Sequence, residues 1–182
     1  MTRKPIFLDR DGVINVDVSP YVCHVDQLEL FPWTVEALRM LDRAGYDIYV
    51  ISNQQGIALG LTPPEQLELI TARIQAALEP EGFQIRKFYY CTAHDGESHP
   101  WRKPAPGMIL AARDEFGLDL DGSFMIGDKD TDMECGTRAG CRPLLVMTGV
   151  TAEHEVRDFP HPPERVFANL HEAVVWVTEE RN

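Results

Sequence analysis

The chain has 182 residues, of which 44% are hydrophobic and 25% are charged. This is the composition of an ordinary globular protein that is long enough to bury a real core. The net charge of -12 argues against a general nucleic-acid binder, which would carry a basic face. No apolar run approaches the roughly 18 residues of a membrane span. We therefore expect neither nucleic acid nor membrane as a partner.

Strands and helices are predicted in regular alternation. Short apolar or β-branched runs predict strands at 6–8, 46–51, 85–90, 123–126, 144–147 and 166–168. Apolar residues at helical spacing predict helices at 33–44, 63–78, 106–116, 131–139 and 170–179. The alternation predicts an α/β fold, a Rossmann-like parallel sheet with helices on both faces. Its length matches one typical domain, so we expect residues 1–182 to form a single domain.

The expected location is the cytoplasm. The first residues enter a strand without a secretory apolar segment. Four scattered cysteines form no tight disulfide framework, which favours a reducing compartment. Nothing in the sequence requires a dimer, so we expect a monomer.

The most informative stretch is Ile-Phe-Leu-Asp-Arg-Asp-Gly at 6–12. A buried strand there would deliver Asp9 and Asp11 to the carboxyl edge of a parallel sheet, where ligands bind in open α/β folds. One carboxylate can act as a nucleophile, and a second one nearby can act as general acid and base. The structural alternative is an Asp-rich turn.

Polar residues also follow three later strands. They are Ser52-Asn53-Gln54, then Arg102-Lys103-Pro104, and finally the run from Gly127 to Asp132, which reads GDKDTD. Each has a structural alternative: a helix N-cap, solvated loop charge, and acids at a helix N-terminus or a poorly matched calcium loop. Because all four sets meet at one edge of the predicted sheet, their joint occurrence favours a reactive site.

These side chains suit phosphoryl transfer. Asp9 and Asp128 can supply carboxylates to Mg²⁺, with the backbone carbonyl of Asp11 as a third oxygen. Lys103 can place positive charge on the phosphoryl oxygens. We expect Asp132 to orient Lys103 or a metal-bound water.

The residues after the second strand offer hydrogen-bond donors. The Ser52 hydroxyl and the amides that follow it, beginning at Asn53, can bind phosphate oxygens. Donors of this kind compensate the phosphate charge without a further cation. We therefore expect Ser52 and Asn53 to contact the substrate.

In this order the motifs resemble those of the haloacid dehalogenase (HAD) superfamily, over nearly the whole chain. The family's Asp-x-Asp pair, its Ser or Thr, its Lys and its final acidic cluster correspond to Asp9, Asp11, Ser52, Lys103, Asp128 and Asp132. The strings at 9–15, 52–58, 102–104 and 127–129 resemble a subgroup more closely. This subgroup contains the D-glycero-D-manno-heptose 1,7-bisphosphate 7-phosphatases, with the histidinol-phosphatase domain as a close relative.

The resemblance implies a two-step phosphatase. Asp9 would attack phosphorus, and Asp11 would protonate the leaving alkoxide and then activate a water that hydrolyses the aspartyl-phosphate. We expect no separate cap domain, since no spare block of roughly 60–100 residues is left for one. Specificity should therefore come from the loops 13–32, 53–61 and 92–105.

The resemblance also implies a small phosphorylated sugar as substrate, with a heptose bisphosphate as the first expectation. Arg102 is the expected second anion contact, and Lys129 is expected to reach the substrate. Histidinol phosphate or another small phosphomonoester is the alternative within the enzyme class. The net negative charge disfavours a DNA-end phosphatase. Outside the enzyme class, the alternative is a non-enzymatic phosphate-binding module.

One motif departs from the subgroup, which usually carries a structural zinc loop before RKP. Cys91, His94 and His99 could act as zinc ligands, but Trp101 stands where a cysteine is expected. Structural zinc takes four ligands, and adjacency to His94 makes Asp95 an awkward fourth. We therefore consider Zn²⁺ doubtful here and expect a metal-free loop held by packing of Trp101.

Overall fold

The computed structural model describes residues 3–180, in which six strands form one parallel sheet. The strands are β1 (Lys4–Leu8), β2 (Tyr46–Asn53), β3 (Lys87–Cys91), β4 (Phe124–Gly127), β5 (Arg142–Val146) and β6 (Arg165–Phe167). Their order across the sheet is β3-β2-β1-β4-β5-β6. The chain therefore winds outward in one direction to β3 and then restarts at β4, on the other side of β1. Such a topological switch point is where open α/β sheets bind ligands.

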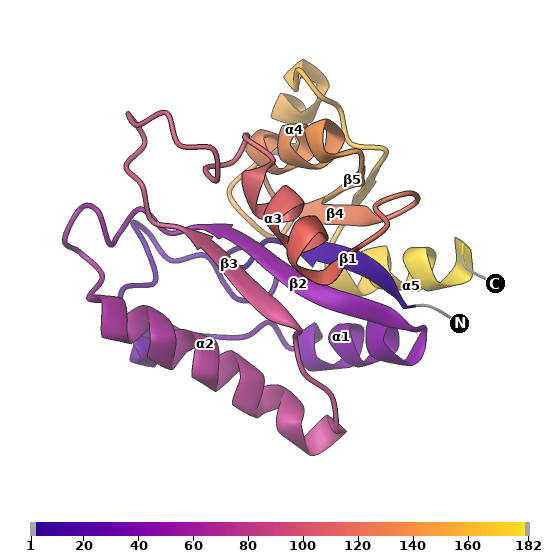
Figure 1. Cartoon of the computed structure of the whole chain (residues 1–182), viewed down its shortest axis with the longest axis horizontal. Coiled ribbons are helices and arrows are strands. Elements are labelled where there is room, and N and C mark those ends of the chain that lie inside the picture. Colours follow the sequence, from indigo (N-terminus) through magenta and orange to yellow (C-terminus); the bar gives the residue numbers. More distant parts are fainter. Residues whose placement is uncertain (1–2, 181–182) are drawn as a thin grey trace.

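Helices cover both faces of the sheet, as the sequence predicts. They are α1 (Thr34–Arg43), α2 (Pro64–Leu78), α3 (Gly107–Phe116), α4 (Asp130–Ala139) and α5 (Leu170–Glu180). Figure 1 shows α1, α2 and α5 on one face and α3 and α4 on the other. Three short 3-10 turns lie in the connections between helices and strands: η1 (Val25–Gln27), η2 (Glu79–Glu81) and η3 (Glu153–Asp158).

The central strand β1 shows why the apolar runs become buried strands. Ile6, Phe7 and Leu8 are all fully buried. Successive side chains of a strand point to opposite faces. Accordingly, Ile6 and Leu8 pack into the core beneath α1, α2 and α5, whereas Phe7 packs into the core beneath α3 and α4. A strand that is apolar at every position therefore fits only between two helical layers.

All eleven predicted helices and strands are present, with ends that differ by one or two residues. The 3-10 turns carry no apolar period and were not predicted. Within residues 3–180, the long connections before α1 and α3 run as loops, in which η1 and two isolated β-bridges are the only regular elements. This confirms the predicted α/β fold without a separate cap domain.

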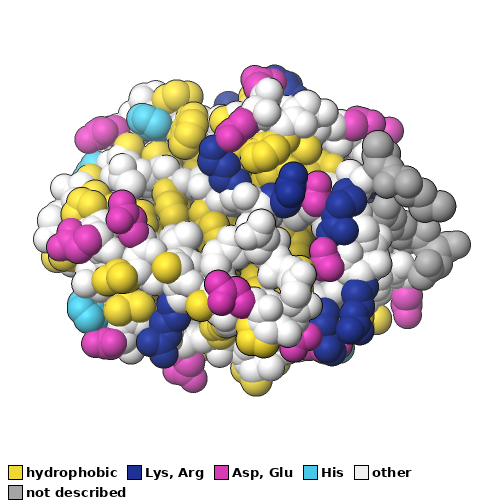
Figure 2. All heavy atoms as spheres, turned by 60° about the horizontal axis from the view of Figure 1, so that its bottom comes forward, with side chains coloured by type: hydrophobic (Ala, Val, Ile, Leu, Met, Phe, Trp, Pro, Cys, Tyr) yellow, Lys and Arg dark blue, Asp and Glu magenta, His cyan; other side chains and the backbone are white. Residues whose placement is uncertain are grey.

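No helix in residues 3–180 combines the length and the apolar character that crossing a bilayer requires. On the face shown in Figure 2, acidic and basic side chains are interspersed with apolar patches and do not gather into one basic surface.

Candidate active site

The site lies where β1 and β4 end, next to the switch point. Asp9 directly follows β1, and its backbone N–H donates to the carbonyl of Ile126 in β4 (2.9 Å). Asp128 directly follows β4. Because β1 and β4 are neighbours in parallel register, the two carboxylates reach the same edge together.

Lys103 comes from the loop before α3 and enters this edge from the side. Its Nζ lies 2.9 Å from Asp9 Oδ1 and 2.6 Å from Asp132 Oδ1, and it donates to the carbonyl of Ile51 (3.0 Å). The side chain is buried. Burial alone would lower the pKa of Lys103, but Asp132 and Asp9 outweigh it and raise that pKa. A permanently charged ammonium group therefore touches the predicted nucleophile.

Asn53 fixes the backbone around Lys103. The Asn53 side chain donates to the Lys103 carbonyl (3.1 Å), and the Lys103 N–H donates back to Asn53 Oδ1 (3.0 Å). Asn53 also lines the pocket. Its predicted contact with phosphate stays a prediction, and the role visible in the structure is to hold Lys103 in place.

Three buried carboxylates form the candidate metal centre. Asp9, Asp128 and Asp132 each offer an oxygen within 4.8 Å of the others. Asp128 is fully buried, and its Oδ1 has no hydrogen-bond partner in the described structure. Burial, followed by the neighbouring Asp132 and Asp9, raises the pKa of Asp128 to about 7. A divalent cation that prefers oxygen ligands would remove this repulsion, so the residues present fit Mg²⁺.

Asp132 is held from two sides. Its Oδ2 accepts the backbone N–H groups of Asp128 (3.2 Å) and Lys129 (3.1 Å) at the start of α4, while Oδ1 faces Lys103. Burial raises the pKa of Asp132, and Lys103 opposes that rise. Asp132 thus joins the metal group to Lys103, in line with the orienting role predicted for it.

Two glycines, Gly12 and Gly149, make room for the Asp128 carboxylate because they have no side chain. A Cβ on Gly149 would lie 1.8 Å from Asp128 Oδ2, and one on Gly12 would lie 2.7 Å from the same atom. Gly12 also has a φ of +81°, which L side chains rarely adopt. Any side chain at Gly149 would displace the carboxylate.

Asp11 is held apart from the three carboxylates and makes an ion pair with Arg10 (2.8 Å). Asn15 and Gln54 also donate to it, at 2.9 and 2.8 Å. Burial would raise the pKa of Asp11, but Arg10 and these hydrogen bonds lower it. Asp11 is therefore ionised in this state. The predicted metal contact of its carbonyl stays a prediction.

Ser52 lies at the end of β2 with its hydroxyl beside the site. It is buried, and its Oγ accepts a hydrogen bond from Gln54 Nε2 (3.0 Å). The same Gln54 amide reaches Asp11, so the second motif is tied directly to the first.

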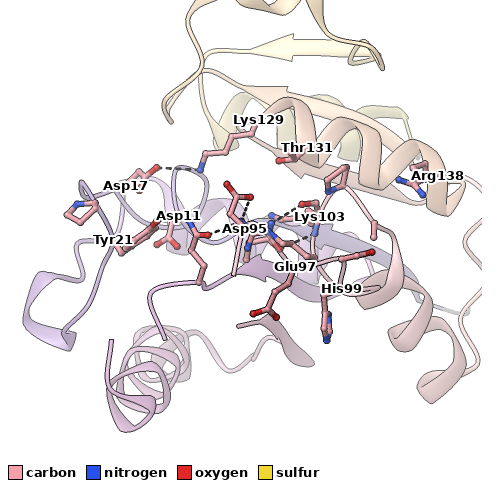
Figure 3. Close-up of a pocket in the computed structure, with 17 residues that line it drawn as sticks. Asp11, Asp17, Tyr21, Asp95, Glu97, His99, Lys103, Lys129, Thr131 and Arg138 are labelled. Atoms are coloured by element: carbon pink, nitrogen blue, oxygen red, sulfur yellow. Dashed lines mark hydrogen bonds and ion pairs between the residues drawn. The ribbon is translucent and has the colours of Figure 1, made fainter. Parts of the chain in front are cut away.

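A cavity of about 690 Å³ lies next to the buried centre and is lined by Lys103, which contacts Asp9. Figure 3 shows Asp11, Lys103 and Lys129 around it, with Arg138 on α4 at the far end from Asp17. Lys129 Nζ lies 3.5 Å from both Asp17 and Asp128. Burial would lower the pKa of Lys129, but Asp128 and the other nearby carboxylates raise it. Lys129 therefore keeps its charge at the cavity wall.

Arg102 forms part of a clamp between loops. Its guanidinium donates to the carbonyl of Ala93 (3.0 Å), to Gln55 (3.1 Å) and to Asp95 (2.8 Å). Gln55 in turn donates to the Tyr21 hydroxyl. The clamp joins the three loops from which specificity was predicted. Arg102 also lines the cavity, so the predicted anion contact would form on a side chain that is already anchored.

The predicted zinc residues do not form a joint site. Cys91 Sγ and His99 Nδ1 lie 3.6 Å apart, whereas His94 Nδ1 accepts the backbone N–H of Gly96 (3.0 Å). Among residues 3–180, the aspartate group described above is the only set of three or more potential ligands close enough to share one ion.

The loop is held by other contacts. The Trp101 ring meets the Tyr89 ring edge-on at 5.9 Å, and Arg102 ties Ala93 to Asp95 as described above. Packing of Trp101 was the predicted replacement for zinc, and this contact is consistent with it.

Several residues around the site were missed by sequence reasoning. Asn15 and Gln54 lie inside the strings 9–15 and 52–58, so a signal for them was present. Gln55 also lies inside 52–58, but Asp17 and Tyr21 belong to no chemical pattern, and only the folded loops bring these two to the cavity.

Known proteins resemble this chain in sequence and in architecture. A HAD-hydrolase-like family model matches residues 100–173. The chain is 37% identical to the D-glycero-D-manno-heptose-1,7-bisphosphate 7-phosphatase of Chlorobaculum tepidum, over 95% of this chain and 93% of the relative. It is 38% identical to the D-glycero-beta-D-manno-heptose-1,7-bisphosphate 7-phosphatase of Escherichia coli, over 82% and 83%.

A solved structure extends the likeness to three dimensions. The D,D-heptose 1,7-bisphosphate phosphatase of B. bronchiseptica, complexed with magnesium and phosphate, superposes with a TM-score of 0.89 at 30% identity. The match covers 97% of this chain and 99% of the other. The chain therefore belongs to the HAD superfamily of phosphatases, in the group that contains the heptose-bisphosphate phosphatases.

Proposed function

We propose that this phosphatase hydrolyses the 7-phosphate of D-glycero-D-manno-heptose 1,7-bisphosphate, with Mg²⁺ as its cofactor. The observation that carries the proposal is the contact of buried Lys103 with Asp9 (2.9 Å), beside Asp128, whose buried Oδ1 has no hydrogen-bond partner in the described structure. A nucleophile, a cation for the phosphoryl oxygens and a metal centre thus meet at one cavity. The names of the homologues support the sugar.

Asp9 and Asp128 would hold Mg²⁺, which would supply the positive charge that lets an anionic nucleophile approach an anionic phosphate. Asp9 then attacks phosphorus. Asp11, which is ionised in the free enzyme, takes up a proton as the dianionic phosphate binds beside it, and gives that proton to the leaving alkoxide as its bond to phosphorus breaks. In the second step a water gives a proton to Asp11 and attacks the aspartyl-phosphate, which releases inorganic phosphate and restores Asp9. Lys103 stabilises the phosphoryl oxygens in both steps.

The cavity also suits a second phosphate. Arg102 and Lys129 border it, and Arg138 lies at its far end. The protein carries a net charge of -12, so a bisphosphate needs such local cations. We therefore assign the outer cavity to the sugar and its 1-phosphate. The single domain over residues 1–182, the monomer and the cytoplasmic location remain predictions of the same proposal.

Phosphate release from a panel of substrates tests the proposal. The panel holds both heptose 1,7-bisphosphate anomers, histidinol phosphate, fructose 1,6-bisphosphate and a 3′-phosphorylated oligonucleotide, each with Mg²⁺. We expect a strong preference for one heptose anomer, which Asp9→Asn abolishes. Even, weak activity across the panel would reject the heptose assignment, and a preference for histidinol phosphate would favour the alternative within the family. No activity with any substrate would favour a phosphate-binding module.

A further inference from the structure

Arg10 lies between the two predicted catalytic aspartates, and the mechanism above gives it no role. It is fully buried and is the largest side chain with that degree of burial. Burying a charged group is costly unless the group is paired and hydrogen-bonded. Because Arg10 stands next to both predicted catalytic aspartates, the group that it pairs with affects the proposed reaction.

The guanidinium of Arg10 grips the carboxylate of Asp11 in a fork. Nε and Nη2 donate to Asp11 Oδ1 at 3.1 and 2.9 Å, and Nη2 donates to Oδ2 at 2.8 Å. Its other side faces the ring of Tyr90, whose centroid lies 6.0 Å from the guanidinium carbon. The Tyr90 hydroxyl bonds to Thr71 on α2 (2.8 Å). Arg10 is thus itself held in place from β3 and α2.

Two neutral amides complete the environment of Asp11. Asn15 donates to Oδ1 and Gln54 donates to Oδ2. Both side chains are buried, whereas the Asp11 side chain keeps 17% of its surface exposed and lines the cavity. The donors therefore contact the Asp11 carboxylate from the protein interior, and its exposed side faces the cavity where the substrate would bind.

We propose that Arg10 is a positioning residue, which with Asn15 and Gln54 sets the place and orientation of the Asp11 carboxylate as it serves the leaving group. The inference rests on the proposed function, because it requires Asp11 to be the general acid. A rigid planar fork can fix both oxygens of a carboxylate, whereas a lysine ammonium is a point charge on a flexible stem. A misplacement of about 1 Å at a reacting group can cost on the order of 100-fold in rate.

The alternative is that Arg10 only stabilises the fold, and leaving-group dependence separates the two roles. p-Nitrobenzyl phosphate and p-nitrophenyl phosphate are similar in size and shape. The first departs as an alkoxide that needs a proton, and the second departs as a stable phenolate that does not. A positioning role for Asp11 therefore affects kcat/KM for the benzyl ester more than for the phenyl ester. Because kcat/KM reports steps up to the first irreversible one, later hydrolysis of the intermediate does not obscure the comparison.

The variants are Arg10→Met, Arg10→Lys and Gln54→Ala, each checked by circular dichroism and thermal melting. Arg10→Lys and Gln54→Ala carry the test if Arg10→Met does not fold. Asp11→Asn is the reference for complete loss of the general acid. Asn53→Ala is the matched control, because it loosens the Lys103 side of the same cavity and leaves the Asp11 contacts intact.

We expect Asp11→Asn and Arg10→Met to lower kcat/KM for the benzyl ester by about 100-fold or more, and for the phenyl ester by less than about fivefold. Arg10→Lys and Gln54→Ala should show the same selectivity to a smaller degree, and Asn53→Ala should lower both substrates equally. In the Asp11→Asn background, a change at Arg10 should add no further selectivity. The folded Arg10 and Gln54 variants could instead lose kcat/KM equally on both esters while Asp11→Asn still affects the benzyl ester more. That result would overturn the positioning role of Arg10 and leave the general-acid assignment of Asp11 standing. No selectivity in Asp11→Asn itself would overturn the general-acid assignment and the inference with it.

Discussion

The inner and outer parts of the site are built differently. In the inner part, Asp128 and Asp132 are fully buried, Lys103 is 4% exposed, and each is tied to a strand end or a helix start. In the outer part, the side chain of Asp95 is 76% exposed, and its partner Arg102 bridges one loop to another.

The difference separates chemistry from recognition. Phosphate is common to all substrates of a phosphatase, and a rigid, buried set of side chains can be preorganised for it. The rest of the substrate varies, and loops at the mouth can change without disturbing the sheet. We therefore expect inner substitutions to abolish turnover and outer substitutions to change the choice of substrate.

The largest effect is expected for Asp9→Asn. The substitution removes the predicted nucleophile but keeps its size, so kcat should fall on the order of 10⁴-fold or more. Steady-state phosphate release with Mg²⁺ measures the loss, and thermal melting confirms that the variant is folded. Retention of more than about a tenth of the wild-type kcat would exclude Asp9 as the nucleophile.

Gly149→Ala should come next. Its Cβ would lie 1.8 Å from Asp128 Oδ2, so the carboxylate must move. We expect the Mg²⁺ concentration for half-maximal activity to rise about 10–100-fold. Gly96→Ala is the matched control, because its nearest contact would be an ordinary 3.6 Å. Unchanged Mg²⁺ dependence in Gly149→Ala would place the metal away from Asp128.

In the outer part, Arg102→Ala should act on binding. We expect KM for the bisphosphate to rise about tenfold, the equivalent of about 1.4 kcal/mol, while kcat falls less than about threefold. Asp95→Asn should change KM less than about threefold, because an exposed ion pair contributes little. A collapse of kcat in Arg102→Ala with unchanged KM would instead assign Arg102 to the inner chemistry.

The smallest effect concerns pH and stability. The pKa of Asp128 is raised to about 7 in the folded chain, well above the value of about 3.9 in an unfolded one. Without metal the folded state therefore binds more protons than the unfolded state, and this group's contribution to stability is lost as pH rises from about 4 through 7.

Mg²⁺ would remove that loss by pairing with the carboxylate. We expect saturating Mg²⁺ to raise Tm by several degrees at pH 8, about 2.7 kcal/mol at a hundredfold excess over Kd, and by less at pH 5.5. Differential scanning calorimetry at both pH values checks this. A larger shift at pH 5.5 would contradict the assignment of Asp128 as a ligand.

The same division explains what could be predicted from the sequence. The inner residues stand next to strands whose apolar runs are strong signals, so the alternation of strands and helices was enough to place Asp9 and Asp128 at one edge of a parallel sheet. That β1 and β4 are neighbours was not predicted and is seen only in the structure. These predictions depended on local patterns that the fold leaves intact.

Among the outer residues, Arg102 and Lys129 were predicted from their motifs, whereas others gave no such signal. Asp17 and Tyr21 belong to a loop without apolar period, and their partners Lys129 and Gln55 lie far along the chain. Only loop conformation decides such pairs. The fork of Arg10 on Asp11 was also unpredicted, because adjacent residues can equally well point apart. One missing cysteine was enough to make zinc doubtful from the sequence. That His94 Nδ1 accepts the backbone N–H of Gly96 is seen only in the structure.

The most direct test of the central claim is to look for the phosphorylated enzyme. Asp11→Asn slows the second step by removing the predicted base, whereas p-nitrophenyl phosphate, whose phenolate leaves without a proton, still phosphorylates Asp9. An aspartyl-phosphate should therefore accumulate when the variant meets this ester and Mg²⁺. Acid quenching followed by peptide mass spectrometry should then find one phosphoryl group on the peptide that contains Asp9, and none in the Asp9→Asn, Asp11→Asn double variant. Phosphate release without a phosphorylated peptide, or a phosphoryl group on another residue, would contradict the account.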